Sequence, residues 1–399
     1  MAFTKAFIPY GAYWSTPFVR WQGSFASKHA MKFAGEIAQR ALAEREIPPD
    51  VFETIVFGMT VPQHHCFYGG PWMAALAGVP TLTGPFIGQA CATSAKCVES
   101  AAREVESGDT SASLVITADR CSNGMHIYHP NPLGPGGKGD SEDWVWDNFS
   151  FDPWAKHSMI QTAENVAKEA GITREETDEC TLMRTQQYEK SLENDRAFQK
   201  KYMVTPIEIK AGKKTIATVE GDEGPFKTTK EGLARLKPVL PDGVVTFGAQ
   251  TFPADGNCGI VVTNADKAKE LSRDKAITIQ LLSYAQARTK KAFMAKAIVP
   301  AGDKALERAG LAMKDIKAIK THTPFAVNDV YFCKNYDLPL NAMNNYGCSL
   351  IYGHPQGPTG ARTIIELIEE LVLLGGGYGM FNGCAAGDTG AAIILKVDV

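Results

Sequence analysis

The chain repeats part of itself, and this internal repeat constrains the fold more than any other feature. The segment ALAEREIPPDVFETIVFG, from Ala41, resembles ALERAGLAMKDIKAIKTH, from Ala305. Apolar residues match at one constant offset: Leu42 with Leu306, Ile47 with Leu311, Phe52 with Ile316, and Ile55 with Ile319. Each copy is typical of a helix end, a turn and a short strand that enters a buried sheet. The repeat therefore predicts two similar halves.

Each copy is followed by a corner and a helix. The first corner holds Cys91 before TSAKCVESAAREVESG, and the second holds His354 in YGHPQGPTGARTIIELIEELVLLGGG. If the halves pack around a pseudo-twofold axis, these two residues face each other and the helices lie side by side. A thiol next to an imidazole is the arrangement of nucleophilic catalysis. The unpaired N–H groups at a helix start also favour a thiolate, so we expect a low pKa at Cys91.

The halves each close with a β-branched run, SASLVITADR in the first and GAAIILKVDV in the second. Such runs alternating with helices predict a largely parallel sheet that is buried on both faces. Between the halves, a stretch rich in Gly, Pro and aromatic residues precedes a charged helical stretch, which predicts an inserted lobe over the site. We therefore predict an N-terminal half at 1–120, completed by about 249–270, an inserted domain at 121–248, and a C-terminal half at 271–399.

Composition excludes several classes of function. The net charge is −3 and no basic run stands out, which argues against a nucleic-acid partner. The nine cysteines have no paired spacing, which is typical of reduced thiols and predicts a cytoplasmic protein. The N-terminus lacks the pattern of a signal peptide, and no run approaches the ~18 apolar residues of a membrane span.

Four blocks of sequence resemble the thiolase family. They are CATSAK at Cys91, TAENVAKEAGITREE from Thr162, RLKPVLPDGVVT from Arg235, and the pair GHPQGPTGAR and NGCAAGDTGAA near the C-terminus. The resemblance covers nearly the whole chain. It implies an α/β protein with a five-layered αβαβα fold, made of two pseudo-twofold-related halves and an inserted loop domain. It also implies an acyltransferase that cleaves or forms a carbon–carbon bond in a 3-oxoacyl-CoA, with coenzyme A as a substrate and no cofactor.

The resemblance also assigns roles to individual residues. Cys91 would be acylated, His354 would activate it, and Cys384 would exchange the substrate α-proton. Carbon–carbon cleavage next to a carbonyl needs a stabilised enolate and an acid that protonates its carbon. The backbone N–H groups of Cys91 and Ala386 would hold the oxyanion of the acyl-transfer step.

Two departures from the family pattern change these expectations. Most thiolases have an Asn-Glu-Ala-Phe motif, whereas this chain has HTPFAVND, which begins with His322. That resembles the sterol-carrier-protein branch, so His322 and His354 would bind the enolate oxygen directly. The sequence CAAG replaces the usual CxGG, so the Cβ of Ala386 narrows the pocket and the left-handed freedom of glycine is lost. This branch implies a homodimer core and a small zinc-ribbon/OB-fold partner in a hetero-oligomer.

A cluster of aromatic residues in the inserted lobe bears on the substrate. We predict that it forms an acyl pocket, together with Met159 and Phe325; its members are Trp144, Trp146, Phe149 and Trp154. Packing of the lobe is the alternative reading. A pocket for a bulky or aromatic acyl group would suit a thiolase of aromatic compound degradation, which cleaves benzoylsuccinyl-CoA to benzoyl-CoA and succinyl-CoA.

Two other functions compete with this interpretation. A decarboxylating condensing enzyme of the ketoacyl-synthase type also uses a Cys-His-His set, but it lacks Cys384 and the TAENVAKEAGITREE block. A non-catalytic acyl-CoA-binding subunit would not need the intact Cys91, His354 and Cys384. The His64-His65-Cys66 run does not complete the three or four ligands that zinc needs, so we predict no metal. That loop is expected to line the pocket or the subunit interface.

Overall fold

Two β-sheets share an equivalent order of four strands, β1–β10–β5–β3 in one and β11–β14–β13–β12 in the other, which confirms the two similar halves. The computed structural model describes residues 2–399. The first sheet has the order β1–β10–β5–β3–β4, with β2 also paired to β10, and the second has the order β11–β14–β13–β12. The strands of the first sheet are β1 Tyr13–Ser15, β2 Val19–Arg20, β3 Thr54–Gly58, β4 Phe86–Ile87, β5 Ala112–Arg120 and β10 Ala254–Thr263. Those of the second sheet are β11 Thr278–Arg288, β12 Ile316–His322, β13 Gly377–Ala385 and β14 Thr389–Asp398.

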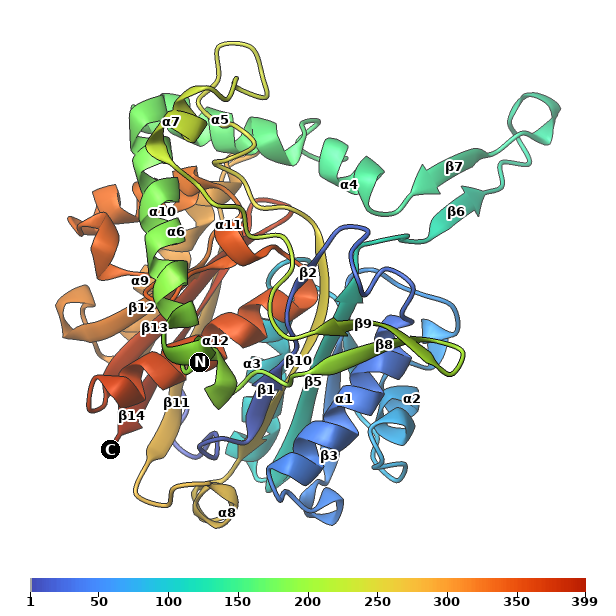
Figure 1. Cartoon of the computed structure of the whole chain (residues 1–399), viewed down its shortest axis with the longest axis vertical. Coiled ribbons are helices and arrows are strands. Elements are labelled where there is room, and N and C mark those ends of the chain that lie inside the picture. Colours follow the sequence, from blue (N-terminus) through green and yellow to red (C-terminus); the bar gives the residue numbers. More distant parts are fainter. Residues whose placement is uncertain (1) are drawn as a thin grey trace.

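Helices complete the five layers that the resemblance implies (Figure 1). On the outer face of the first sheet lie α1 (Ala30–Glu44) and α2 (Gly69–Leu76), and their apolar residues share one buried cluster with that sheet. Between the sheets lie α3 (Thr93–Ser107) and α12 (Gly357–Leu373), in a second cluster that includes strands of both sheets. The outer face of the second sheet is covered by α9 (Ile298–Ala309). The remaining elements of the halves are α8 Ala265–Leu271, α10 Ala326–Tyr336 and α11 Ser349–Tyr352.

The two central helices start side by side, as the repeat predicts. A Cβ added to Gly360 would lie 3.2 Å from the Cβ of Ser94, so the backbones approach too closely for a larger residue. The hydroxyl of Ser94 donates a hydrogen bond to the carbonyl of Gly357, between the first turns of the two helices. The corners that precede these helices, with Cys91 and His354, are therefore held next to each other.

The sheets differ from the prediction in two respects. They are mixed rather than largely parallel, because β3–β4, β3–β5 and β12–β13 are the parallel pairs and the other pairs are antiparallel. The strand that matches β5 is β13, with the sequence GYGMFNGCA, which was not predicted from the sequence. The predicted closing strand, β14, instead matches β10. Glycine is depleted in strands, and here burial between neighbouring strands overrides that preference.

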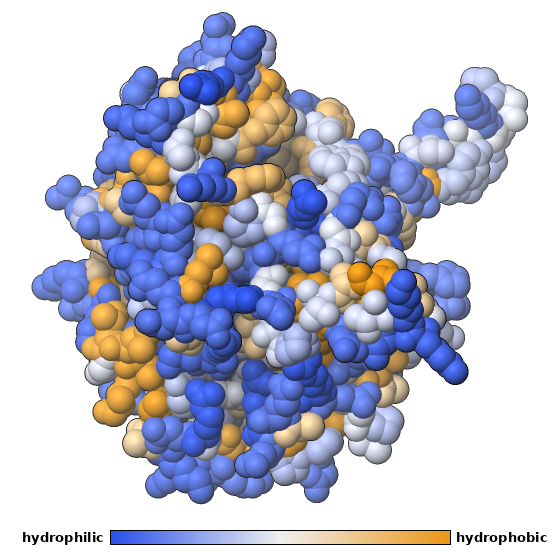
Figure 2. Space-filling view, viewed as in Figure 1, coloured by the Kyte–Doolittle hydropathy of each residue, from blue (hydrophilic) through white to orange (hydrophobic). Residues whose placement is uncertain are grey.

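The segment between the halves contains short strands and two longer helices. Its elements are β6 His126–His129, β7 Asp140–Asp143, α4 Trp146–Ser150, α5 Met159–Ala170, α6 Arg174–Arg196, β8 Ile207–Ala211, β9 Lys214–Val219 and α7 Lys230–Ala234. A capping box of Thr173 and Glu176 fixes the start of α6. The β6–β7 hairpin projects as a separate arm that is mostly hydrophilic (Figures 1 and 2). Short 3-10 turns join elements at Pro49–Val51, Cys66–Tyr68, Pro135–Gly137, Gln199–Lys201, Met294–Ala297, Met313–Asp315 and Leu340–Ala342.

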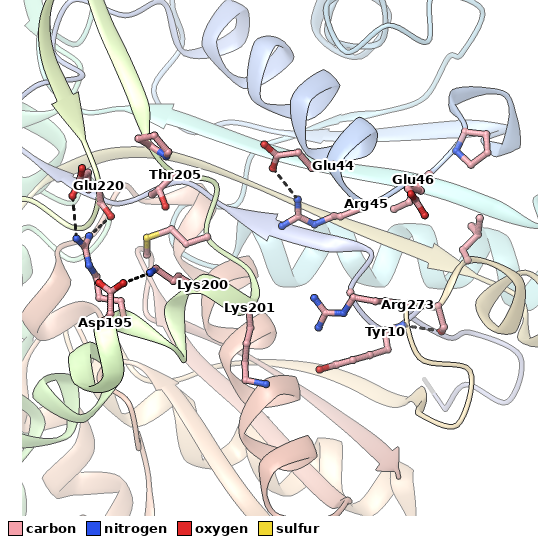
Figure 3. A pocket seen from close by; sticks show the side chains of 18 of the residues that line it. Tyr10, Glu44, Arg45, Glu46, Asp195, Lys200, Lys201, Thr205, Glu220 and Arg273 are labelled. Atoms are coloured by element: carbon pink, nitrogen blue, oxygen red, sulfur yellow. Dashed lines mark hydrogen bonds and ion pairs between the residues drawn. The ribbon is translucent and has the colours of Figure 1, made fainter.

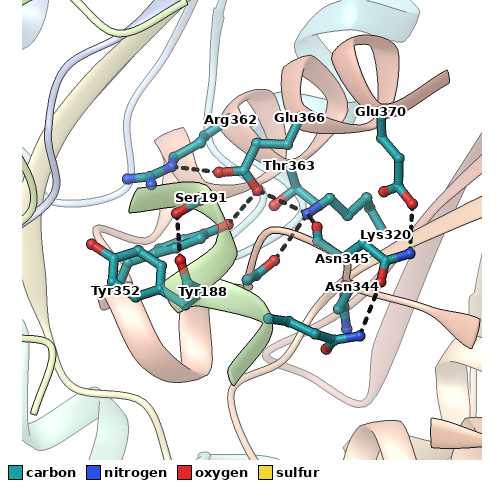
Figure 4. A network of polar contacts seen from close by, with 12 residues as sticks. Tyr188, Ser191, Lys320, Asn344, Asn345, Tyr352, Arg362, Thr363, Glu366 and Glu370 are labelled. Atoms are coloured by element: carbon teal, nitrogen blue, oxygen red, sulfur yellow. Dashed lines mark hydrogen bonds and ion pairs between the residues drawn. The ribbon is translucent and has the colours of Figure 1, made fainter. Parts of the chain in front are cut away.

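A buried ionic network ties this segment to α12, and Figure 4 shows the part of it around Arg362 and Glu366. The guanidinium of Arg362 donates to both carboxylate oxygens of Asp222 at 2.6 and 2.8 Å and to Glu366 at 2.9 Å. Lys320 and Tyr352 donate to the other carboxylate oxygen of Glu366. Removing one partner of such a buried pair typically costs about 3–5 kcal/mol, so the network fixes the position of α12. Within residues 2–399, none of the helices has the length and apolar character needed to cross a bilayer.

Candidate active site

The corner that holds Cys91 is tightly structured. Ala90, immediately before it, has a φ of +44°, a conformation that residues other than glycine rarely adopt. The hydroxyl of Thr93 donates to the carbonyl of Ala90 at 2.7 Å and accepts the N–H of Gln89 at 2.8 Å. These bonds hold the turn and place Cys91 just ahead of the first turn of α3. The predicted strand-to-helix corner is confirmed.

His354 contacts Cys91 directly. Its Nε2 lies 3.1 Å from the Sγ of Cys91, and its Nδ1 lies 2.6 Å from the hydroxyl oxygen of Thr359. With the Nδ1 proton donated to Thr359, Nε2 carries the lone pair that can accept the thiol proton. This is the geometry that a base needs in order to activate a thiol.

The Cys91–His354 pair does not have the low thiol pKa that the helix start predicts. Burial raises the pKa of the Cys91 thiol to about 12, although the N–H of Ala386 lowers it. Burial and the neighbouring His322 hold the pKa of His354 well below its usual range. A helix start is therefore not enough to produce a resting thiolate at this depth. The geometry holds a neutral thiol next to a neutral imidazole, and the proton must move as the thiol attacks.

His322 lies at the end of β12, against the same imidazole. Its ring centroid is 4.1 Å from that of His354, and its Nδ1 lies 3.0 Å from the hydroxyl oxygen of Ser349. Its Nε2 is buried and has no hydrogen-bond partner among the described residues. Burial lowers the pKa of His322 to about 3, so the ring is neutral. With the Ser349 hydroxyl donating to Nδ1, an Nε2–H group points at the site and can stabilise an oxyanion.

Cys384 lies on β13 and is almost fully buried. Its Sγ accepts a hydrogen bond of 3.1 Å from Nδ2 of Asn328. Burial and the nearby Cys91 raise the pKa of the Cys384 thiol, which keeps it protonated. Asn328 was not predicted from the sequence as a site residue, although it belongs to the HTPFAVND segment. A protonated thiol is the form required of a proton donor.

Ala386 follows β13 and supplies a backbone donor. Its N–H lowers the pKa of Cys91, which places this group at Sγ. The loss of left-handed freedom at Ala386 has no effect on this backbone, because in the described chain the positive φ angles of this turn fall on Gly387 and Asp388, at +82° and +61°. Alanine therefore fits this position without backbone strain.

Two further residues at the corner were missed by the sequence analysis. The Oε1 of Gln356 accepts a hydrogen bond from the Sγ of Cys91 at 3.4 Å. The buried carboxylate of Asp119, at the end of β5, accepts the N–H of Gly357 at 2.8 Å and two backbone N–H groups at Thr60 and Val61. Asp119 thus joins the start of α12 to the loop after β3. No short-range pattern marks either residue, because their partners are far away in the sequence.

A mainly apolar cavity of about 1310 Å³ opens at Cys91 and His354. Five of the predicted pocket residues line it: Trp144, Trp146, Phe149, Met159 and Phe325. Trp154 does not line it. That side chain is 60% exposed, and the Lys291 ammonium lies 5.0 Å from its ring centroid. The assignment of Trp154 to the pocket is therefore wrong, because the turn after α4 directs it outward.

Comparison with known proteins identifies the family. Residues 12–266 match the thiolase N-terminal domain, and residues 275–397 match the thiolase C-terminal domain. The chain belongs to the thiolase family.

Relatives of this thiolase match over almost their full length. The mitochondrial 3-ketoacyl-CoA thiolase of Mus musculus is 28% identical over 96% of both chains, and the acetyl-CoA acetyltransferase of Allochromatium vinosum is 27% identical over 94% of this chain and 95% of its own. The acetyl-CoA acetyltransferase structure of Bacillus anthracis has a TM-score of 0.90 at 27% identity, with 99% of both chains covered. The structure of human mitochondrial 3-ketoacyl-CoA thiolase in complex with CoA also has a TM-score of 0.90, at 25% identity, with the whole of both chains covered. These matches confirm the predicted fold and place the thiolase among acyltransferases.

The thiolase has a second, polar cavity of about 960 Å³ on another part of its surface (Figure 3). Its cationic groups already have partners. The guanidinium of Arg45 donates to the carbonyls of Tyr13, Ala41 and Tyr202, and Lys200 pairs with Asp195. This cavity contains none of the predicted site residues.

The His64-His65-Cys66 loop of the thiolase lies outside the apolar cavity, so its assignment as a pocket wall is wrong. The carbonyl of His64 accepts a hydrogen bond of 2.7 Å from Nε2 of His29. The next two residues, Phe67 and Tyr68, are 89% and 70% exposed. Across residues 2–399, no cluster of three potential metal ligands includes this loop. A position at a subunit interface stays a prediction.

The neutral Cys91–His354 pair predicts how alkylation depends on pH. We expect the rate of Cys91 alkylation by iodoacetamide to rise about tenfold per unit between pH 6 and pH 9, because the thiolate fraction of a thiol with a pKa near 12 grows in that proportion. Peptide mass spectrometry after timed labelling measures this rate at Cys91 alone. A rate that stays flat over this range would mean that a thiolate–imidazolium pair exists at rest.

Proposed function

We propose that this thiolase cleaves or forms 3-oxoacyl-CoA thioesters with a bulky or aromatic acyl group, such as benzoylsuccinyl-CoA, which gives benzoyl-CoA and succinyl-CoA. The observation that carries the proposal is the aromatic wall of the cavity at Cys91, made of Trp144, Trp146 and Phe149. A flat aromatic ring gains from contact with such side chains, both through the area that it buries and through edge-to-face geometry.

The aromatic wall is anchored to the catalytic corner. Nε1 of Trp144 donates to the carbonyl of Thr60 at 2.8 Å, and Thr60 donates from both its N–H and its hydroxyl to Asp119 at 2.8 Å. The same carboxylate accepts the N–H of Gly357, at the start of α12. Trp144 is thus fixed relative to His354 and Cys91. A preorganised wall of this kind supports selection of a defined acyl group over loose packing of the lobe.

In the proposed first half-reaction, Cys91 takes the acyl group. Nε2 of His354 accepts the thiol proton as Sγ attacks the 3-oxo carbon. The bond between the α-carbon and that carbon then breaks, which leaves an acylated Cys91 and an enolate. Nε2–H of His322 binds the enolate oxygen together with His354, and the Cys384 thiol donates its proton to the enolate carbon. The first product leaves as an acyl-CoA, and the charges left are a Cys384 thiolate and a His354 imidazolium.

In the second half-reaction, coenzyme A takes the acyl group from Cys91. The CoA thiol gives its proton to the Cys384 thiolate and attacks the thioester carbonyl. The N–H groups of Cys91 and Ala386 hold the oxyanion of the tetrahedral intermediate. When this intermediate collapses, Cys91 leaves as a thiolate and recovers its proton from His354. The protons balance, and the enzyme returns to its neutral resting state.

One residue of the cavity lining suits coenzyme A. Among the described residues that line the cavity, Lys227 is the one that is a Lys, Arg, Asp or Glu. It lies beside Phe226 and Thr228, on the segment before α7. An ammonium group there suits the phosphates of CoA. The related human thiolase was solved in complex with CoA, which supports the same ligand in this chain.

Three further parts of the proposal, which concern the branch of the family, the oligomer and the location, rest on particular residues. The histidine at position 322 supports the sterol-carrier-protein-like branch and, with it, a small zinc-ribbon/OB-fold partner. Exposed Phe67, Tyr68 and Phe86, close to the edge strand β4, support a homodimer through this edge. The unpaired cysteines support a cytoplasmic location, although several relatives are named as mitochondrial.

The proposal predicts a preference between two substrates. We expect kcat/KM for benzoylsuccinyl-CoA to exceed that for acetoacetyl-CoA by about 10–100-fold, since a phenyl ring that buries ~100 Å² of apolar surface gains about 2.5 kcal/mol. Both assays include any partner subunit that copurifies. Trp144→Ala should remove most of this preference, whereas Trp154→Ala is the matched control, because that tryptophan lies outside the cavity. Equal or better turnover of acetoacetyl-CoA would leave a thiolase without aromatic selection.

A further inference from the structure

Three potential metal ligands meet at the catalytic corner. The Sγ of Cys91 and one ring nitrogen each of His322 and His354 all lie within 4.8 Å of one another. In a tetrahedral zinc site, bonds of ~2.0–2.3 Å to nitrogen and sulfur place the ligand atoms ~3–4 Å apart. Nε2 of His354 and Sγ of Cys91 already have such a separation, at 3.1 Å. Small movements of these side chains would bring all three ligand atoms within bonding distance of one ion.

An unsatisfied nitrogen independently points to a ligand at this place. Nε2 of His322 has no hydrogen-bond partner among the described residues, and the side chain is 1% exposed. A buried polar atom without a partner costs free energy, so it normally has a function or a ligand. Its ring centroid lies 4.1 Å from that of His354, with the two ring planes tilted by 32°, so this nitrogen belongs to the same small space as the thiol.

The outer contacts of both rings are those of metal-binding histidines. A metal-ligating histidine almost always has a hydrogen-bond partner on its other nitrogen, which fixes the ring and the tautomer. Here Nδ1 of His322 lies 3.0 Å from the hydroxyl oxygen of Ser349, and Nδ1 of His354 lies 2.6 Å from that of Thr359. To bind an ion, His322 takes the tautomer in which Nδ1–H donates to Ser349 and Nε2 carries the lone pair, the reverse of the tautomer that donates Nε2–H to an oxyanion. Both Nε2 atoms are thereby directed toward Cys91. The ion would reach them through the cavity, whose lining includes Cys91, His354 and Gln356.

We propose that Cys91, His322 and His354 form a reversible, inhibitory binding site for Zn²⁺. Cys91 releases its proton to solvent on binding, one thiolate and two imidazoles hold the ion, and the fourth position is open to water. Bound zinc occupies the nucleophile, so the enzyme cannot accept an acyl group, and it shields the thiol from alkylation and oxidation. The histidine at position 322, where most of the family has asparagine, supplies the third ligand. The site is distinct from the His64-His65-Cys66 loop.

Spectroscopy with Co²⁺ tests the site without any substrate. We expect one equivalent of Co²⁺, added to metal-free protein, to give a thiolate charge-transfer band and the visible bands of four-coordinate cobalt, and Zn²⁺ to remove them. Cys91→Ser should lose the charge-transfer band, and His322→Asn should weaken binding by at least about tenfold. His64→Ala combined with Cys66→Ala is the control and should keep the spectrum. Loss of the spectrum in that control, or its survival in Cys91→Ser, would overturn the proposal.

Alkylation of the unmodified chain gives a second test that needs no variant. Zn²⁺ should slow the reaction of Cys91 with iodoacetamide by about tenfold or more, and a chelator should restore the rate, because a metal-bound thiolate is a poor nucleophile. Peptide mass spectrometry resolves Cys91 from Cys66, the other half-buried cysteine. An unchanged rate at Cys91 would refute the zinc site. Neither measurement depends on the acyl substrate, so failure here leaves the proposed thiolase reaction untouched.

Discussion

Cys91→Ala is expected to abolish thiolysis, with a fall in kcat of about 10⁵-fold, because Cys91 is the one thiol among the described residues that line the cavity, and its partner base contacts it directly. His354 would remain, but Nε2 would have no thiol to activate. Steady-state turnover of a 3-oxoacyl-CoA measures the loss. Mass spectrometry of the intact protein, mixed with acyl-CoA, should show a thioester adduct on the unmodified chain and none on the variant.

Cys66→Ser is the control for this substitution, since Cys66 is also half-buried but lies outside the cavity. It should keep its turnover and its acyl adduct. Turnover by Cys91→Ala within tenfold of the unmodified chain would mean that the acyl group is carried elsewhere or that CoA attacks the substrate directly. An adduct that forms without turnover would instead favour the non-catalytic acyl-CoA-binding alternative.

The large features of the fold were predictable because they depend on local and repeated patterns. The constant offset between the copies at Ala41 and Ala305 predicted two halves, and the helix that follows each corner predicted α3 and α12. The pairing of strands was harder to predict. β13 contains three glycines, and its strand conformation depends on β12 and β14 on either side. Parallel or antiparallel pairing likewise depends on neighbours that are distant in the sequence.

The site was predictable where a residue lies at a fixed place in the repeat. Cys91 and His354 occupy matching corners, so their contact follows from the pseudo-symmetry. Gln356 and Asp119 occupy no such matched position, and their roles come from hydrogen bonds to residues far along the chain. The low pKa expected of Cys91 was wrong for a related reason. A helix start gives a local field, but burial is a property of the whole fold and outweighs it.

Cys384→Ser is expected to reduce carbon–carbon cleavage by about 10²–10⁴-fold, the usual contribution of a general acid or base. A serine hydroxyl can keep the hydrogen bond from Asn328, but it releases its proton far less readily than a thiol. Acylation of Cys91 by a simple acyl-CoA needs no α-proton. Its rate in the variant should therefore stay within a few-fold of the rate in the unmodified chain. The two rates are measured by turnover and by mass spectrometry of the acyl adduct.

The same variant separates a thiolase reaction from decarboxylating condensation. Cleavage must protonate an enolate carbon, and solvent deuterium should therefore enter the α-position of an acyl-CoA with the unmodified enzyme but not with Cys384→Ser. Decarboxylation produces the carbanion without removal of an α-proton, so an enzyme of that type would not need the Cys384 thiol. Cys333→Ser, another buried cysteine changed in the same way, controls for the introduced hydroxyl and should retain both reactions. Full cleavage activity in Cys384→Ser would assign the proton transfer to another group and would reopen the condensing-enzyme alternative, because Cys91, His322 and His354 alone are common to both chemistries.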